Sequence, residues 1–268
     1  MILALAAIYI ILSLFIGGDR TSKALITLSV NLILLFLTVG AVFIGASPVV
    51  AALLSCLLIT LNTLFYQNEV NPKTKAAFVS VIIIIALMLP LIYWLTTASA
   101  IYGFPVGQYT IRKSNGYEEA IGINMVCIQI LVILIILIGA VIDNALSVTS
   151  SMYELYQTNP AISRRELFAS GMNIGKNILS STVNTLFFIF MGEYFTLFIL
   201  FMRYFTFQQM INSKEFAQQV ITITVSGFGS ILIIPAAALI SCLFYLKEKK
   251  KSRHKKPALF QRKKERLS

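Results

Sequence analysis

A carboxylate that follows an apolar run is the residue of this sequence with the clearest capacity for chemistry. Asp143 comes after residues 125–138, which contain no charged side chain. At about 100° per residue of an α-helix, one narrow face contains Asp143, Ser147, Ser150 and Glu154, with Asn144 beside it. An ionised Asp at the centre of a bilayer costs about 2.5–3.5 kcal/mol on insertion scales, so such acids usually have a function. The pattern makes Asp143 a candidate proton carrier; the open alternative is a structural carboxylate at the membrane surface.

A second polar stripe follows in the next apolar segment. It repeats the spacing of the first stripe with Asn173, Asn177, Ser180 and Asn184. Two such stripes can pack together through interhelical hydrogen bonds, so we expect them to face each other. Lys176 adjoins the stripe and, with Glu154, is a candidate for the cytoplasmic proton exit. Gly171 and Gly175 have the spacing that permits close helix packing.

Other kinds of chemistry find little support. The three cysteines stand singly in apolar runs, and the one histidine, His254, lies near the C-terminus. The sequence contains no HExxH motif, P-loop, nucleophile elbow or paired intramembrane aspartates. We therefore predict a protein that is not an enzyme and that has no metal site and no cofactor.

Composition indicates where these residues reside. Of 268 residues, 57% are hydrophobic and 12% are charged, whereas soluble domains contain about 25% charged residues. Backbone groups in lipid must be hydrogen-bonded within the segment, which favours helices. We predict an all-α, polytopic transmembrane helix bundle with spans at 1–17, 25–46, 49–66, 77–100, 121–143, 175–192 and 217–246. Gly192-Glu193 interrupts the apolar sequence, so the shorter apolar segment 194–207 is predicted to be a separate re-entrant or interfacial helix. Residues 102–120 are predicted to be a polar loop.

Two local signals separate the polar stripes. The helix that carries Asp143 is expected to continue to about residue 156, until Asn159-Pro160 breaks it. Ser163 and Glu166 then have the spacing of a capping box, which predicts the start of the next helix.

Charge is concentrated at the C-terminus. Residues 247–268 contain eleven Lys and Arg against two Glu, although the net charge of the whole chain is only +11. We predict one transmembrane domain over 1–246, followed by a basic, disordered cytoplasmic tail at 247–268 that binds anionic lipid rather than nucleic acid. By the positive-inside rule, the C-terminus is cytoplasmic and, with seven spans, the N-terminus is outside.

A family resemblance supports the membrane assignment. The sequence resembles the YibE/F family of bacterial membrane proteins at Gly139-Ala-Val-Ile-Asp143, Ser150-Ser151, Glu154, Asn159-Pro160, Ser170-Gly171, Gly175, Asn184-Thr185-Leu186 and Gly192. This likeness implies a multi-pass protein of the bacterial inner membrane that forms a homo-oligomer or pairs with a longer homologue. A weaker likeness to RND permeases, including SecD/SecF, concerns Asp143 with Asn144 and Pro235, and implies that Asp143 carries protons.

Two functions remain open at this point. The first is an ion-coupled, specifically proton-coupled, transporter or transporter subunit of unknown substrate. The second is a non-transporting membrane partner or scaffold of an envelope complex. Replacement of Asp143 by Asn is expected to abolish the first function and to spare the second.

Overall fold

The computed structural model describes residues 1–102, 110–112, 118–120 and 124–265. Its described part is mostly helical, with short connections and one pair of short strands, which confirms the all-α class and the multi-pass character. Six helices within it are long and apolar enough to cross a membrane. They are α1 (Ile2–Phe43), α2 (Pro48–Leu61, continued by the π-helix η1, Asn62–Gln67), α3 (Pro72–Ala98), α4 (Met125–Thr158), α5 (Arg164–Tyr204) and α7 (Lys214–Glu265).

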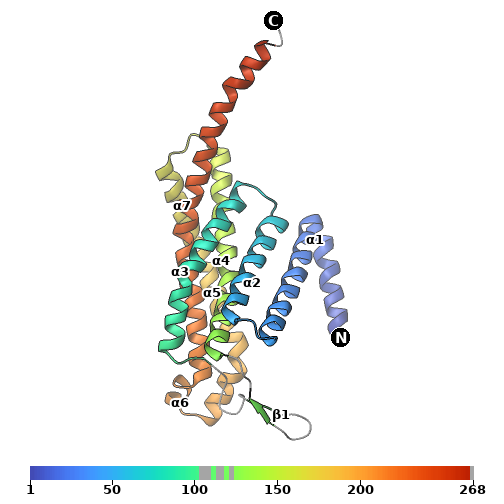
Figure 1. Ribbon diagram of the computed structural model, residues 1–268, viewed down its shortest axis with the longest axis vertical. Coiled ribbons are helices and arrows are strands. Elements are labelled where there is room, and N and C mark those ends of the chain that lie inside the picture. Colours follow the sequence, from blue (N-terminus) through green and yellow to red (C-terminus); the bar gives the residue numbers. More distant parts are fainter. Residues whose placement is uncertain (103–109, 113–117, 121–123, 266–268) are drawn as a thin grey trace.

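The N-terminal helix α1 bends sharply. The backbone of Gly18 has φ +54° and ψ −140°, a non-helical conformation that residues other than glycine rarely adopt. Figure 1 shows the two arms of α1 running in opposite directions. Tyr9 and Leu28 line the same cavity, as the bend requires, because these residues would lie far apart on one straight helix. The spans predicted at 1–17 and 25–46 correspond to the two arms of this single helix.

Helix α4 forms the centre of the bundle and packs against α2, α3, α5 and α7 (Figure 1). Its inward face is apolar and fully buried at Leu134, Leu137, Val141 and Ala145. α7 approaches this face closely, because a Cβ added to Gly229 would overlap Leu137. The face of α4 opposite this core is left for other contacts.

The end of α4 and the start of α5 are where the local signals placed them. Asn124 caps α4 by accepting hydrogen bonds from the backbone of Val126 (3.0 Å) and Cys127 (3.3 Å), and α4 ends one residue before Asn159. The capping box is formed: the Ser163 backbone donates to Glu166 Oε2 at 3.1 Å, and the Glu166 backbone donates to Ser163 Oγ at 3.2 Å.

Polar side chains join the second arm of α1 to α2 and η1. Asn62 donates to Asn31 Oδ1 (2.8 Å), and Asn31 donates to Thr63 Oγ1 (3.2 Å). At the end of the helices beside the bend, Lys23 forms an ion pair with Glu69 at 2.9 Å. This ion pair and its hydrogen bond hold the pKa of the Glu69 carboxyl below its usual value.

Three segments differ from the sequence prediction. Residues 194–204 are not a separate re-entrant or interfacial helix but the end of α5, because neither Gly192 nor Glu193 stops a helix. The short helix α6 (Phe207–Ile211) follows. Inside the predicted loop, β1 (Thr110–Arg112) and β2 (Glu118–Ala120) pair antiparallel, with Thr110 opposite Ala120. Residues 247–265, predicted to be disordered, extend α7 as a helix, to which the helix-forming tendency of Lys, Arg and Glu contributes.

The two termini lie at opposite ends of the bundle (Figure 1). The N-terminus is at the end that carries α6 and the hairpin, here called the hairpin end. The extension of α7 projects from the other end, near the junction of α4 and α5, here called the tail end.

Candidate functional site

Asp143 lies near the middle of α4 in its length. At about 1.5 Å per residue, it is about 27 Å from Met125 and about 22 Å from Thr158. On the neighbouring helix α5, Thr182 is likewise about 27 Å from Arg164. α4 is about 50 Å long and the hydrocarbon of a bilayer is about 30 Å thick, so a bilayer centred on α4 would enclose Asp143.

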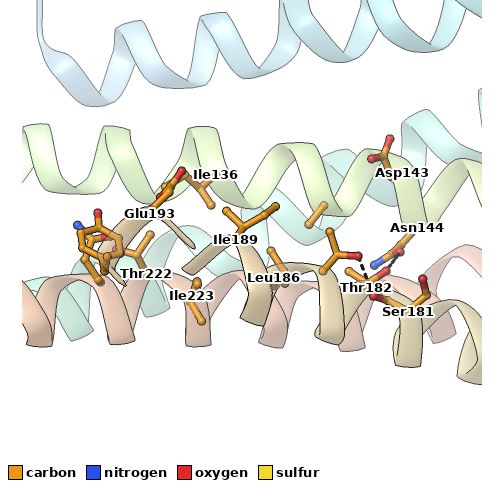
Figure 2. Close-up of a pocket in the computed structure, with 14 residues that line it drawn as sticks. Ile136, Asp143, Asn144, Ser181, Thr182, Leu186, Ile189, Glu193, Thr222 and Ile223 are labelled. Atoms are coloured by element: carbon orange, nitrogen blue, oxygen red, sulfur yellow. Dashed lines mark hydrogen bonds between the residues drawn. The ribbon is translucent and has the colours of Figure 1, made fainter. Parts of the chain in front are cut away.

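A groove of about 380 Å³ opens beside this acid, between α4, α5 and α7 (Figure 2). Asp143 and Glu193 lie toward opposite ends of it. The groove contains two carboxylates and no basic side chain, and its walls mix hydroxyl, amide and apolar groups. The lining residues are Ile136, Ala140, Asp143, Asn144, Ser181, Thr182, Thr185, Leu186, Ile189, Glu193, Tyr194, Gln219, Thr222 and Ile223.

One hydrogen bond between α4 and α5 forms part of the groove wall. Thr182 Oγ1 donates to Asn144 Oδ1 at 2.8 Å (Figure 2), and it also lies 3.1 Å from the Ile178 carbonyl. Asn144 is 1% exposed, and its Nδ2 has no partner within the described protein. Buried amide donors are nearly always satisfied, so this nitrogen is an unfavourable feature of the helix contact.

Of the α4 stripe, only Asp143 reaches the groove. Its side chain stands at the edge of the groove, is exposed and points away from the Asn144–Thr182 pair (Figure 2). Ser147 and Glu154 are exposed and Ser150 is half-buried, and they continue the same face toward the tail end. None of these three residues lines the groove.

The α5 stripe is also on the surface of the single chain. The side chains of Asn173, Lys176, Asn177, Ser180 and Asn184 are all exposed, and none lines the groove. Contrary to our expectation, the two stripes therefore do not face each other within one chain. Instead, Asn144, directly after Asp143, contacts Thr182 of α5. A step of one or two residues along a helix changes the side-chain direction by about 100–200°, so residues next to a stripe can face a helix that the stripe itself does not face.

Gly171 and Gly175 lie where α5 packs closely on its neighbours. A Cβ added to Gly171 would lie 2.5 Å from Met152 Sδ of α4 and 3.2 Å from Ala238 Cβ of α7. A Cβ added to Gly175 would overlap the side chain of Ile234 on α7. Both glycines are buried, so they pack the helices of this chain and are not on a surface available to a partner.

The sequence did not single out several groove residues. Glu193 was interpreted as an interruption between helices, and Gln219 and Thr222 of α7 were not considered. Their spacing of three, which puts them on one face of a helix, was the available signal. Within the described part of the chain, no group of three or more His, Cys, Asp or Glu residues is placed to hold a metal ion.

Comparison with known proteins identifies the family. The model of the YibE/F-like protein family matches residues 5–247, which include the whole bundle except the first residues of α1 and the end of α7. No curated protein and no solved structure matches the chain. Since the match covers most of the chain, this multi-pass membrane protein belongs to the YibE/F-like family.

Proposed function

We propose that the chain is a proton-coupled transporter or the membrane subunit of one, with Asp143 as the proton carrier. The observation that carries this proposal is the position of Asp143: midway along α4, at the border of a groove whose walls mix polar and apolar groups. Insertion scales put the cost of an ionised Asp at this depth at about 2.5–3.5 kcal/mol. Protonation removes that cost and thereby favours one conformation over another.

The groove supplies a route for protons between helices. The hydroxyl groups of Ser181, Thr182 and Thr185 line the groove beside Asp143. Glu193 stands toward the other end of the same groove and is a second group that accepts protons. From Asp143 toward the tail end, Ser147 and Glu154 continue the polar face, and Lys176 lies on the adjacent helix. A proton that crosses 100 mV supplies about 2.3 kcal/mol, comparable with the cost of the buried charge.

The proposal includes seven membrane crossings, with the two arms of α1 counted separately. The tail end carries Arg20, Lys23, Lys73, Lys75, Arg164 and Arg165 in addition to the basic residues of 247–265. By the positive-inside rule, this end faces the cytoplasm of a bacterium and the N-terminus faces outward. Membrane-impermeant labelling of an Asn68→Cys variant tests this: labelling from the outside of intact cells contradicts it.

Infrared difference spectroscopy of the purified protein in lipid tests the carrier without knowledge of the substrate. A pH titration of the wild-type protein is expected to show a protonated-carboxyl band that Asp143→Asn removes. The near-isosteric Asp143→Asn exchange preserves volume, and Asp19→Asn, at the bend of α1, is the matched control because Asp19 is outside the groove.

A measurement of proton flux into vesicles tests whether the protein transports protons. With a membrane potential imposed and a pH dye inside, Asp143→Asn is expected to lose the protein-dependent flux, whereas Asp19→Asn retains it. If the carboxyl band and the flux both persist in Asp143→Asn, Asp143 is not the carrier.

A second candidate function is a non-transporting partner that steadies a larger membrane complex. The observation that favours it is the exposure of two polar stripes, on α4 and α5, which a partner helix can cover. In that case Asp143→Asn preserves every activity of the complex, and changes at Asn177 or Ser180 disrupt its assembly. The proton-flux assay separates the two functions.

A further inference from the structure

Two adjoining cavities lie between α1, η1 and the start of α3, apart from the groove beside Asp143. The first, of about 590 Å³, lies where the bend of α1 meets the connection from η1 to α3, both of which are at the tail end of the bundle (Figure 1). The second, of about 280 Å³, lies between the two arms of α1 beside η1. Gln67, the last residue of η1, lines both cavities, so they are neighbours.

The first cavity, here called the polar cavity, is lined only by polar and charged side chains. Its three bases, Arg20, Lys23 and Lys73, outnumber its two acids, Asp19 and Glu69. Lys23 is paired with Glu69 at 2.9 Å, whereas neither Arg20 nor Lys73 forms an ion pair within the described chain. Lys73 also lies in the first turn of α3, which contains no acidic residue although the positive end of the helix dipole favours an anion there. The polar cavity therefore suits an anionic group such as a phosphate.

The wall of the polar cavity formed by the connection from η1 to α3 is held in place by hydrogen bonds. Glu69 has φ +63°, a left-handed conformation that is uncommon for residues other than glycine. Its carboxylate accepts from Lys23, and its carbonyl accepts from Thr74 Oγ1 at 2.9 Å. The side chain of Asn68 donates to the carbonyl of Thr63 at 2.9 Å. Because these bonds fix the connection, a ligand meets a preformed wall and orders little of the chain on binding.

The second cavity, here called the apolar cavity, has apolar side chains on both arms of α1, including Tyr9 on the first arm and Leu28 on the second. Two of its polar side chains satisfy each other, since Asn31 donates to Thr63 Oγ1 at 3.2 Å. The cavity follows residues 21–31 of the second arm, a length of about 15 Å at about 1.5 Å per residue. A hydrocarbon chain fits this lining better than a hydrated group does.

The order of the two cavities is that of a membrane lipid. The polar cavity lies at the connection between two helices that are long and apolar enough to cross a membrane, and the apolar cavity continues from it along α1. A phospholipid likewise has a phosphate at the end of such helices and acyl chains alongside them. A free phosphate would use the polar cavity alone.

We propose that the two cavities form a binding site for one glycerophospholipid, with its phosphate held by Arg20 and Lys73 and one acyl chain between the arms of α1. The lipid would join the first arm of α1 to the rest of the bundle. The inference does not depend on proton transport, because no residue lines both this site and the groove beside Asp143.

Native mass spectrometry of the full-length protein in detergent tests the site, by titration with phosphatidylethanolamine. This lipid has no net charge, so the basic residues of 247–268 attract it little. The variant Arg20→Gln with Lys73→Gln removes both bases of the site. The matched control, Lys75→Gln with Arg165→Gln, removes two exposed bases at the same end of the bundle that line neither cavity.

The variant without Arg20 and Lys73 is expected to bind the first lipid about tenfold more weakly, because an exposed charge pair contributes a factor of up to about five. The control is expected to bind it as the wild type does. Equal weakening in the two variants overturns the proposal, because it would mean a general attraction by charge. Absence of bound lipid on the wild-type protein overturns it as well.

Two further measurements distinguish a lipid from a free phosphate. Ala24→Phe fills the apolar cavity and keeps both bases, and it is expected to weaken lipid binding; its melting temperature without lipid checks that it folds. Inorganic phosphate at the same concentration is expected not to displace the lipid from the wild type. Displacement by phosphate, or binding by a folded Ala24→Phe protein equal to that of the wild type, would mean an anion site without a lipid and overturns the proposal.

Discussion

Replacement of Gly175 by Ala tests the close packing of α5 on α7. The added Cβ would overlap Cγ2 of Ile234, a branched side chain with little rotamer freedom, 4% exposed in the core. Overpacking of this kind costs about 1–3 kcal/mol, and Ala in place of Gly returns about 0.5–1 kcal/mol of helix propensity. We therefore expect a net destabilisation of about 0.5–2 kcal/mol.

Equilibrium unfolding in mixed dodecyl maltoside–SDS micelles, followed by circular dichroism, measures this change. Gly192→Ala is the matched control, because it lies on the same helix and a Cβ there meets nothing within 4 Å. It is expected to leave stability unchanged or to raise it by up to about 1 kcal/mol. Gly171→Ala is expected to cost less than Gly175→Ala, since its nearest neighbour is the flexible end of Met152.

Two results would refute this reasoning. One is a Gly175→Ala protein as stable as the wild type. The other is equal destabilisation by Gly192→Ala, which would mean that the flexibility of glycine, not its small size, matters in α5. In support, adding Ile234→Ala to Gly175→Ala is expected to cost less than the sum of the two single changes, because the overlapping atoms are removed.

Three further predictions concern polar contacts. Thr182→Val removes the hydroxyl that donates to Asn144 and is expected to lower the free energy of unfolding by about 0.6–1.7 kcal/mol; an unchanged value in the same micelle titration would contradict it. Ser163→Ala removes one half of the capping box and is expected to destabilise the first turn of α5 by about 0.5–2 kcal/mol; amide exchange should rise there and not in the capped first turn of α3. The hydrogen bond and ion pair with Lys23 lower the pKa of Glu69, so their contribution is full above the ordinary carboxyl pKa and is lost as pH falls through the lowered value. The melting temperatures of wild type and Glu69→Gln should therefore differ at neutral pH and converge in acid, once Glu69 is protonated in the folded protein.

The helix ends were predictable because their causes are local. Asn159-Pro160 and the pair Ser163 and Glu166 act through the backbone within a few residues, so the end of α4 and the start of α5 follow from the sequence alone. Glu193 shows the opposite error. A charge inside an apolar segment suggested an interruption, but a charged side chain at a helix surface leaves the backbone hydrogen bonds intact, and α5 continues.

The partners of each helix face were not predictable, because periodicity gives the angle between residues but not the neighbour at that angle. The α4 stripe is one continuous exposed face, as its spacing predicted, yet α5 does not cover it. The groove draws on Gln219 and Thr222 of α7, which is separated from α4 by a whole helix in the sequence. Contacts of that range are set by the packing of the entire bundle.

The adjacent residues Asp143 and Asn144 of α4 lie in different environments, one exposed and the other buried. Neighbouring side chains on a helix point about 100° apart, so burying Asn144 against Thr182 requires Asp143 to emerge at the edge of the bundle. The amide, which is neutral, takes the enclosed position, where an uncompensated charge would cost most. The carboxylate takes the position at the edge of the groove, on the exposed stripe of α4 that also carries Ser147 and Glu154. An exchange of the two residues, Asp143→Asn with Asn144→Asp, would bury the charge against α5. We expect this double variant to be less stable than Asp143→Asn alone in the same micelle titration. Equal stabilities of the two variants would contradict this account of the pair.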